Sequence, residues 1–240
     1  MLALLLNSGL GSRMGESSAS RPKCLTPLAS GETILGRQMR LLLSAGVDSF
    51  VITTGPFPDL IENEVATVAP TAKVIYVPNP LYQTTNYIYS IYLAKDHLVH
   101  DMLLLHGDLV FDEKLLPETL KSAASVVTVF PEVSTMNKDF KALTDGTKVT
   151  AIGTALFENS VSLQPLYLLR LNDWRVWLGE IERFVAGGKV TVYAENAFNE
   201  ISSHCALLPL PVLGERCLEI DDQNDLARAN LLISRWETGQ

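Results

Sequence analysis

Two glycines and two cations near the start of the chain form the first group of residues that could do chemistry. Residues 4–6 are leucines and predict a short buried strand, and Gly9 and Gly11 lie in the loop that follows it. Glycine lets the backbone adopt positive φ angles and approach a ligand without a Cβ in the way. Arg13 and Lys23 then add a planar and a compact positive charge. This combination favours a polyphosphate ligand.

Two better-known phosphate loops do not fit this stretch. A dinucleotide-binding fingerprint needs glycine at the sixth position counted from Gly9, where Met14 stands, and the next predicted strand ends in threonines without an acid for a ribose. The sequence Gly-Lys-Ser/Thr of a Walker A loop occurs nowhere in the chain. An ordinary strand-to-helix turn would explain a bare Gly-x-Gly. The interpretation as a phosphate site therefore depends on the added cations.

Carboxylates that follow apolar strands form the second group. Asp108 comes shortly after the run 101–106, and a carboxylate at the end of a buried strand is costly unless it is solvated or paired, so a metal ion is a suitable partner. An ordinary turn aspartate is the alternative, and His106 is expected to be a strand residue. Near the C-terminus, Asp221 ends a predicted strand and Asp222 can cap the next helix. Capping explains one of these two aspartates but does not need both.

The elements that must position these residues alternate between helix and strand in the first half of the chain. The pattern predicts a helix at 33–45 that ends at Gly46, a strand at 49–54, a helix near 59–67, and strands at 73–77 and 101–106. This order is typical of a parallel sheet with right-handed crossovers. Open sheets of this kind bind ligands at the carboxyl edge of the strands, which is where Asp108 would lie.

The second half is less regular. Asp145-Gly146 stands between two β-rich runs and predicts a hairpin, which we expect to extend the sheet. The other elements predicted there are a strand at 125–130, a segment at 163–171 that crosses the site, a helix at 174–185, a strand at 189–193, a short helix from 194 and a helix after 222.

Composition limits the classes of protein to which the chain can belong. With 240 residues, 47% of them hydrophobic and 19% charged, residues 1–240 are expected to form one globular domain. A net charge of -8 argues against a nucleic-acid partner. The first residues are apolar over too short a stretch for a signal peptide or membrane span, so no membrane partner is expected. Three cysteines without paired or metal-like spacing fit a reducing cytoplasm.

The first loop also carries a resemblance to a known family. Leu-x-x-Gly-x-Gly-Ser-Arg-Met, followed by Pro-Lys-x-Leu, resembles the signature of the sugar-nucleotidyltransferase superfamily. The resemblance implies a Rossmann-like (GT-A-like) α/β fold, with a mostly parallel central sheet, helices on both faces and the small β extension. It also implies that Arg13 and Lys23 hold a nucleoside triphosphate. The nucleotide-binding residues that it implies in this stretch are Leu6, Asn7, Ser8, Gly9, Gly11, Ser12, Arg13 and Lys23. Asn7-Ser8 departs from the usual Ala-Ala, which leaves base selection open.

Two later runs resemble the phosphocholine and phosphonate cytidylyltransferase branch. Thr-Asn-x-x-x-Ser-Ile-Tyr-Leu-Ala implies that Asn86 and Ser90 face the nucleotide, although an amphipathic core helix with a polar cap would explain most of this run. Tyr-Ala-Glu-Asn-Ala-Phe-Asn implies that Glu195 meets the ammonium end of the acceptor. A solvated glutamate in the first turn of a helix is the alternative for this residue. Tyr167 and Trp174 are further acceptor candidates, because aromatic faces attract quaternary ammonium groups.

The same resemblance implies a metal site and a mechanism. Asp108 and Asp221 would together hold Mg²⁺, while Asp222 caps the helix. The expected reaction transfers CMP from CTP to phosphocholine or a phosphonate such as 2-aminoethylphosphonate, with Lys23, Arg13 and Asp108 as the catalytic residues. The alternatives are a sugar-1-phosphate nucleotidyltransferase and a non-catalytic nucleotide-binding module. A dinucleotide-dependent oxidoreductase fails on the glycine spacing.

Overall fold

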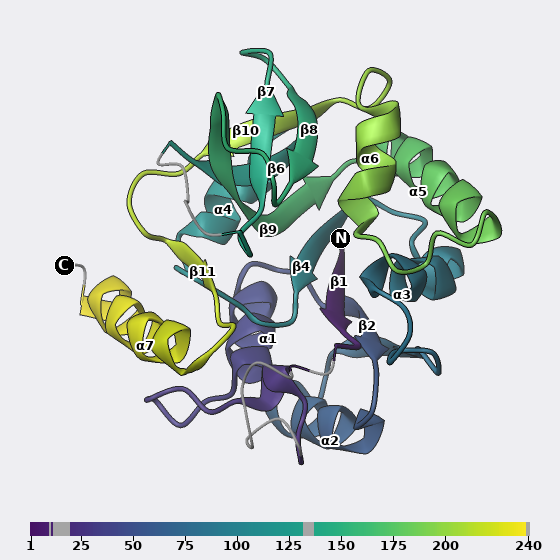
Figure 1. Cartoon of the computed structure of the whole chain (residues 1–240). Helices are drawn as coiled ribbons and strands as arrows, with labels where there is room; N and C mark the ends of the chain where they lie inside the picture. Colours follow the sequence, from purple (N-terminus) through teal and green to yellow (C-terminus); the bar gives the residue numbers. More distant parts are fainter. Residues whose placement is uncertain (10, 12–19, 132–136, 239–240) are drawn as a thin grey trace.

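The computed structural model describes residues 1–9, 11, 20–131 and 137–238, and the fold is an α/β sandwich around one large sheet (Figure 1). Ser12 and Arg13 lie outside the described residues. The strands are β1 (Leu2–Asn7), β2 (Ser49–Thr54), β3 (Lys73–Pro78), β4 (Met102–His106), β5 (Leu109–Phe111), β6 (Ser125–Phe130), β7 (Lys141–Thr144), β8 (Val149–Gly153), β9 (Ser160–Leu169), β10 (Leu207–Pro211) and β11 (Cys217–Glu219). The α-helices are α1 (Ile34–Ser44), α2 (Pro58–Val68), α3 (Tyr87–Ala94), α4 (Leu115–Leu120), α5 (Leu171–Ala186), α6 (Ala194–Ile201) and α7 (Gln223–Thr238).

The central sheet is mostly parallel, as the alternating elements predict. Its strands follow the order β10-β6-β9-β4-β1-β2-β3. β1 runs parallel to both β2 and β4, and β10 runs parallel to β6. β9 runs antiparallel to both of its neighbours, β4 and β6. The expected α/β fold class is therefore confirmed, and the first loop follows a strand in the middle of the sheet.

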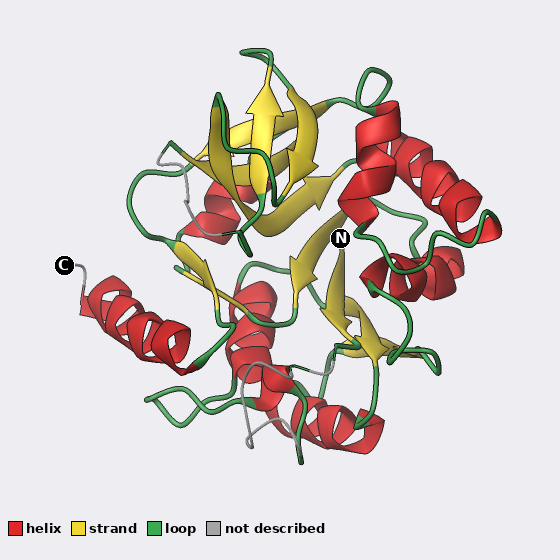
Figure 2. Ribbon diagram, in the orientation of Figure 1, coloured by secondary structure: helices red, strands yellow, loops and turns green. Residues whose placement is uncertain are grey.

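Helices cover both faces of the sheet (Figure 2), and the side chains of β1 show how the two core layers form. Leu4 and Leu6 pack on the face that α3, α5 and α6 cover, whereas Ala3 and Leu5 pack on the face that α1, α2 and α4 cover. Successive side chains of a strand point to opposite faces, so an all-apolar strand is buried on both. No helix among the described residues is both long and apolar enough to cross a lipid bilayer.

Local signals in the sequence set the ends of several elements. The Thr33 hydroxyl accepts a hydrogen bond from the Gly36 N–H and caps α1, and Gly46 leaves that helix with a φ of +84°. The predicted hairpin is present as β7 and β8, which extend the sheet beside β9. Gly146 has a φ of +93° in its turn, and the Asp145 carboxylate accepts the N–H groups of the residues that follow.

The strand predicted at 189–193 is wrong, because this segment is a loop. Its backbone serves two helix ends instead of a sheet. The Val190 carbonyl accepts the Asn86 N–H at 2.8 Å, at the start of α3. Three residues later, the Tyr193 N–H donates to the Asn196 side chain at 3.0 Å, at the start of α6. Alternating apolar residues in this short run reflect packing between helices.

A small second sheet joins the C-terminal part of the chain to the centre. β11 pairs antiparallel with β5, which begins directly after Asp108, and Glu219 stands opposite Leu109. α7 then packs through Ala229 and Ile233 against apolar residues from the first third of the chain and β5. This pairing brings Asp221 to the carboxyl edge of the central sheet, which local sequence alone does not specify.

Gly55, which directly follows β2, allows the first loop to pass close to it. A Cβ at this position would lie 2.4 Å from the Ser8 carbonyl oxygen, a backbone atom that cannot rotate away. We expect Gly55→Ala to lower the free energy of unfolding by about 1–3 kcal/mol, since overpacking forces backbone shifts. Gly179 in α5 is the matched control because a Cβ there meets nothing within 4 Å. Gly179→Ala should raise stability by about 0.5–1 kcal/mol. Urea unfolding midpoints measure both changes, and an unchanged midpoint for Gly55→Ala would contradict the close approach.

Candidate active site

A cavity of about 260 Å³ lies at the carboxyl ends of β1 and β4. The first loop, the segment after β3, the start of α3 and the turn after β4 supply its walls. The sequence-predicted nucleotide residues that line it are Leu6, Asn7, Ser8, Gly9, Gly11, Lys23, Asn86 and Ser90. His106 and Asp108 line it as well. The structure thus brings together every described residue that was assigned to the nucleotide.

Lys23 occupies the centre of this arrangement. It begins a short 3-10 helix, Lys23–Leu25, after Pro22, and its side-chain stem packs against Gly11. A Cβ on Gly11 would lie 2.9 Å from the Lys23 Cβ, and Gly11 has a φ of +62°, so this position requires glycine. The Lys23 Nζ donates to Asp108 Oδ2 at 2.5 Å and to Asp221 Oδ1 at 2.8 Å. One ammonium group therefore joins residues from the beginning, middle and end of the chain.

The charges of these three residues control one another. Burial lowers the pKa of Lys23, but the negative charges of Asp108 and Asp221 outweigh this effect and leave the pKa above its ordinary value. The lysine is therefore protonated at neutral pH. With side-chain exposures of only 12%, 21% and 13%, the ammonium and the two carboxylates interact in partly desolvated surroundings.

The two carboxylates offer oxygen ligands of the kind that Mg²⁺ prefers. Asp108 Oδ1 is buried and has no hydrogen-bond partner among the described atoms, although a carboxylate oxygen normally accepts several bonds. The Asp221 carboxylate contacts the Lys23 ammonium, as Asp108 does, but from the segment that follows β11. Hard divalent cations prefer carboxylate oxygens, waters and phosphate oxygens as ligands. Asp108 and Asp221 therefore fit the metal that the sequence predicts.

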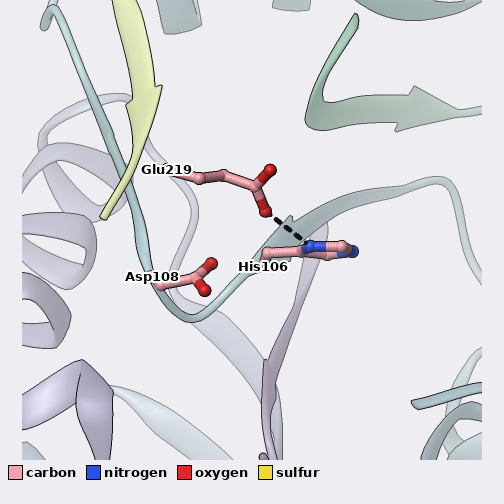
Figure 3. Close-up of side chains that lie close together, drawn as sticks. All are labelled: His106, Asp108 and Glu219. Atoms are coloured by element: carbon pink, nitrogen blue, oxygen red, sulfur yellow. Dashed lines mark hydrogen bonds and ion pairs between the residues drawn. The ribbon is translucent and has the colours of Figure 1, made fainter. Parts of the chain in front are cut away.

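His106, which was expected to be only a strand residue, lies beside this site. Figure 3 shows the carboxylates of Asp108 and Glu219 directed toward the same space, with Glu219 joined to His106, and one potential ligand atom of each of the three residues lies within 4.8 Å of the others. His106 Nδ1 lies 2.9 Å from Glu219 Oε1. Burial lowers the pKa of His106, but the Glu219 carboxylate outweighs it, and the net pKa is raised. The histidine and Glu219 thus form a partly buried hydrogen-bonded pair next to Asp108. Its place directly before Gly107-Asp108 was the available sequence signal.

A polar network shapes the side of the cavity formed by α3. The Asn86 Oδ1 accepts the Tyr87 N–H and caps the helix, in agreement with the prediction that a polar residue begins it. The Asn79 amide donates to the Ser90 hydroxyl at 3.0 Å and to the Thr85 hydroxyl at 3.0 Å. Asn79 was missed by sequence reasoning. It stands between two prolines directly after β3, a pattern that marks a turn at the sheet edge.

Asn7 and Ser8 carry hydrogen-bonding groups with no partner among the described residues. Both side-chain polar atoms of Asn7 and the Ser8 hydroxyl are buried, and both residues line the cavity. A buried amide or hydroxyl without a partner costs about 1–3 kcal/mol. A bound ligand that meets these groups would recover this energy. The departure from Ala-Ala thus places polar side chains in this part of the wall.

The three acceptor candidates lie elsewhere. Tyr167 and Trp174 have no exposed surface, and Glu195 is 2% exposed. The Glu195 carboxylate accepts hydrogen bonds from the hydroxyls of Tyr87 and Tyr167, and Trp174 packs edge-to-face against Trp177 in the core. None of the three lines either cavity described here. Trp174, which was expected to contact the acceptor, is instead a core residue. Glu195 accepts a hydrogen bond from Tyr87, which lines the first cavity.

A second cavity of about 490 Å³ lies on the other side of Asp221. It is bounded by the ends of β6 and β9, the loop before β11 and the start of α7. The charged and amide side chains that line it are Lys138, Asp139, Gln164, Glu215, Glu219, Asp221, Asp225 and Arg228. Asp222 stays outside this lining and caps α7, because its carboxylate accepts the N–H groups of Asn224 and Asp225. Its expected capping role is confirmed.

Comparison with curated proteins finds relatives that act on nucleotides. The chain is 39% identical over 129 residues to the CMP-5'-(3-aminopropyl)phosphonate synthase of Streptomyces rubellomurinus, an alignment that covers 51% of this chain and 20% of that protein. It is 22% identical over 135 residues to the CTP:phosphoglutamine cytidylyltransferase of Campylobacter jejuni, covering 54% of this chain and 52% of that protein. The chain thus spans about half or less of the length of these relatives.

Solved structures share the fold over nearly the whole chain. The CTP:phosphocholine cytidylyltransferase of Streptococcus pneumoniae superposes with a TM-score of 0.79 at 16% identity, covering 97% of this chain and 99% of that one. The inositol-1-phosphate CTP transferase of T. maritima superposes with a TM-score of 0.81 at 18% identity, covering 99% and 96%. At these identities the likeness establishes the fold.

The sequence pattern of one protein family covers most of the chain. The family described as the MobA-like NTP transferase domain matches residues 3–202. This range includes the first loop, the Asn86 helix and Asp108, and it ends before the β11 strand that leads to Asp221. The chain therefore belongs to the family of MobA-like NTP transferase domains.

Proposed function

We propose that the chain transfers CMP from CTP to a small phosphorylated or phosphonate acceptor and releases pyrophosphate. The observation that carries this proposal is the contact of the Lys23 ammonium with Asp108 and Asp221 at the edge of the first cavity. These hydrogen bonds join a cation that would contact the phosphates to two carboxylates that would hold a metal. A module that only binds nucleotides has little need for the second carboxylate.

The choice of CTP is supported by the relatives and by the cavity wall. The names of the Streptomyces and Campylobacter proteins specify CMP and CTP chemistry, and two solved structures of the same fold are described as CTP-using transferases. The unpartnered polar groups of Asn7 and Ser8 offer donors and acceptors for the edge of a base. Asn86 and Ser90 lie in the same wall and are proposed to face the nucleotide.

The residues divide the work as follows. Asp108 and Asp221 would hold Mg²⁺, which when bound neutralises charge on the transferred phosphate. Lys23 is proposed to lie between the two anionic reactants and reduce their repulsion. Arg13, which lies outside the described residues, is proposed to hold the departing phosphates. No general base is required, because the second pKa of a phosphate monoester lies near 6 and its oxygen is already ionised at pH 7.

The preferred acceptors carry a positively charged nitrogen, either a primary ammonium or a quaternary ammonium. The relative with 39% identity is named for an aminopropyl phosphonate, and phosphocholine appears in the description of a structure with the same fold. A sugar-1-phosphate nucleotidyltransferase remains the alternative, since a solved structure described as a glucose-1-phosphate thymidylyltransferase superposes with a TM-score of 0.78. That likeness is one of fold, at 17% identity.

Pyrophosphate release tests the function directly. The protein is incubated with each common ribonucleoside triphosphate against phosphocholine, 2-aminoethylphosphonate and glucose-1-phosphate. We expect release with CTP and an amine-bearing acceptor, because the polar wall and the relatives both favour this pair. Release with the sugar phosphate alone would replace the proposal by its alternative. Triphosphate binding without release from any pair would indicate a non-catalytic module.

Removing the central charges should stop turnover. Lys23→Ala and Asp108→Asn are each expected to lower kcat at least about 100-fold, as removal of one group that stabilises transition-state charge does. Lys121→Ala, on the exposed surface, is the matched control and should keep wild-type turnover. If either site variant retains activity within about threefold of wild type, a difference of less than 1 kcal/mol in the barrier, the assignment is wrong.

The metal requirement can be measured on two neighbouring aspartates. EDTA should abolish pyrophosphate release and Mg²⁺ should restore it. Asp221→Asn should raise the Mg²⁺ concentration for half-maximal rate at least about tenfold, since even indirect partners of a metal change its affinity by that much. Asp222→Asn is the control, because asparagine caps a helix as well as aspartate does. Equal Mg²⁺ requirements for the two variants would rule out Asp221 as a ligand.

A further inference from the structure

We propose that the second cavity binds the acceptor and that Lys138 holds its phosphate or phosphonate group. This inference rests on the proposed function and adds the place and the anion-binding residue of the second substrate. Lys138 carries no role in the sequence prediction. Its position relative to Asp221 is the starting point.

The Asp221 carboxylate lies between the two cavities. Its Oδ1 accepts from Lys23, which lines the first cavity, and its Oδ2 lies 3.6 Å from the Nζ of Lys138, which lines the second. In-line displacement requires the attacking oxygen and the leaving pyrophosphate on opposite sides of the transferred phosphorus. If the nucleotide occupies the first cavity, the acceptor must therefore approach from the side on which Lys138 lies.

Lys138 is held in place by a carboxylate that is itself anchored. Its Nζ lies 2.7 Å from Asp225 Oδ2, and the same oxygen accepts the backbone N–H groups of Asp221 and Asp222. A lysine ammonium carries a full positive charge at neutral pH. A metal on Asp221 would neutralise that carboxylate and leave more of the lysine charge available to an anion.

The other cation of this cavity is less suited to the task. Arg228 is 55% exposed at its side chain and pairs with Glu215, whereas the side chain of Lys138 is 22% exposed. Of these two side chains, Lys138 is the one with a described ion pair to Asp221. An acceptor phosphate that is to approach the metal would therefore meet Lys138.

The remaining walls favour an acceptor with a positive end. Asp139, Glu215 and Glu219 line the cavity, so it carries more carboxylates than cations. The Gln164 Oε1 is buried there without a hydrogen-bond partner among the described atoms and can accept from the N–H groups of a primary ammonium, such as that of 2-aminoethylphosphonate. A molecule with an anionic head and an amine matches this distribution better than a neutral sugar does. The volume of about 490 Å³ is sufficient for such a small molecule.

The test compares acceptor and nucleotide parameters for Lys138 variants. We expect Lys138→Ala to raise KM for 2-aminoethylphosphonate or phosphocholine roughly 10- to 100-fold, as loss of a hydrogen bond to a charged group does. KM for CTP should stay within about twofold of wild type, since Lys138 lies outside the first cavity. Lys138→Arg should recover part of the acceptor affinity because it keeps the charge. Lys121→Ala is the control for loss of a surface lysine.

Calorimetric titration of the wild-type protein and Lys138→Ala with the same acceptor gives a readout that is independent of turnover. Loss of acceptor binding with retained CTP binding and an unchanged urea midpoint supports the inference. Unchanged acceptor binding by Lys138→Ala, or an equal loss of binding for CTP and acceptor, overturns the inference about Lys138. In that case an active wild-type enzyme still supports the proposed function. If the wild-type protein neither turns over nor binds any acceptor, both proposals fail.

Discussion

One ammonium group, that of Lys23, holds the described site together. Asp108 and Asp221 would repel each other if they shared a partly buried pocket without a cation, and Lys23 supplies that cation. The Gly11 conformation, the 3-10 turn after Pro22 and the β5–β11 pairing all serve to bring these three groups to one point. A metal that binds the carboxylates would release the lysine toward an anionic substrate. The same charge neutralises the two carboxylates and, in the proposed function, would also contact an anionic substrate.

Much of the fold could be predicted from sequence because its signals are local. Strands such as 49–54 are apolar runs bounded by turn residues, and the Thr33 and Asn86 caps and the Asp145-Gly146 turn act within a few residues. The Gly9 to Lys23 spacing likewise identified one wall of the first cavity. The run 189–193 failed because its alternating pattern reflects packing between helix ends, which a period-two rule cannot distinguish from a strand.

The acceptor side could not be predicted for a physical reason. Whether Glu195, Tyr167 or Trp174 faces solvent depends on how α5 and α6 pack on the sheet, and the packing places all three in the core. Conversely, Lys138 and Gln164 become neighbours of Asp221 only through contacts between distant segments. His106 and Asn79 illustrate the same limit, since their partners Glu219 and Ser90 are fixed by tertiary structure.

The late position of Asp221 has a consequence for biosynthesis. Every described residue that lines the first cavity is in place by residue 108, whereas the second carboxylate follows β11 near the end of the chain. A nascent chain therefore contains all of the described lining residues of the first cavity well before Asp221 is synthesised. Asp221 reaches the Lys23 ammonium in a fold in which β11 is paired with β5. If the proposed function holds, a product that ends before β11 lacks the second carboxylate and cannot catalyse the transfer.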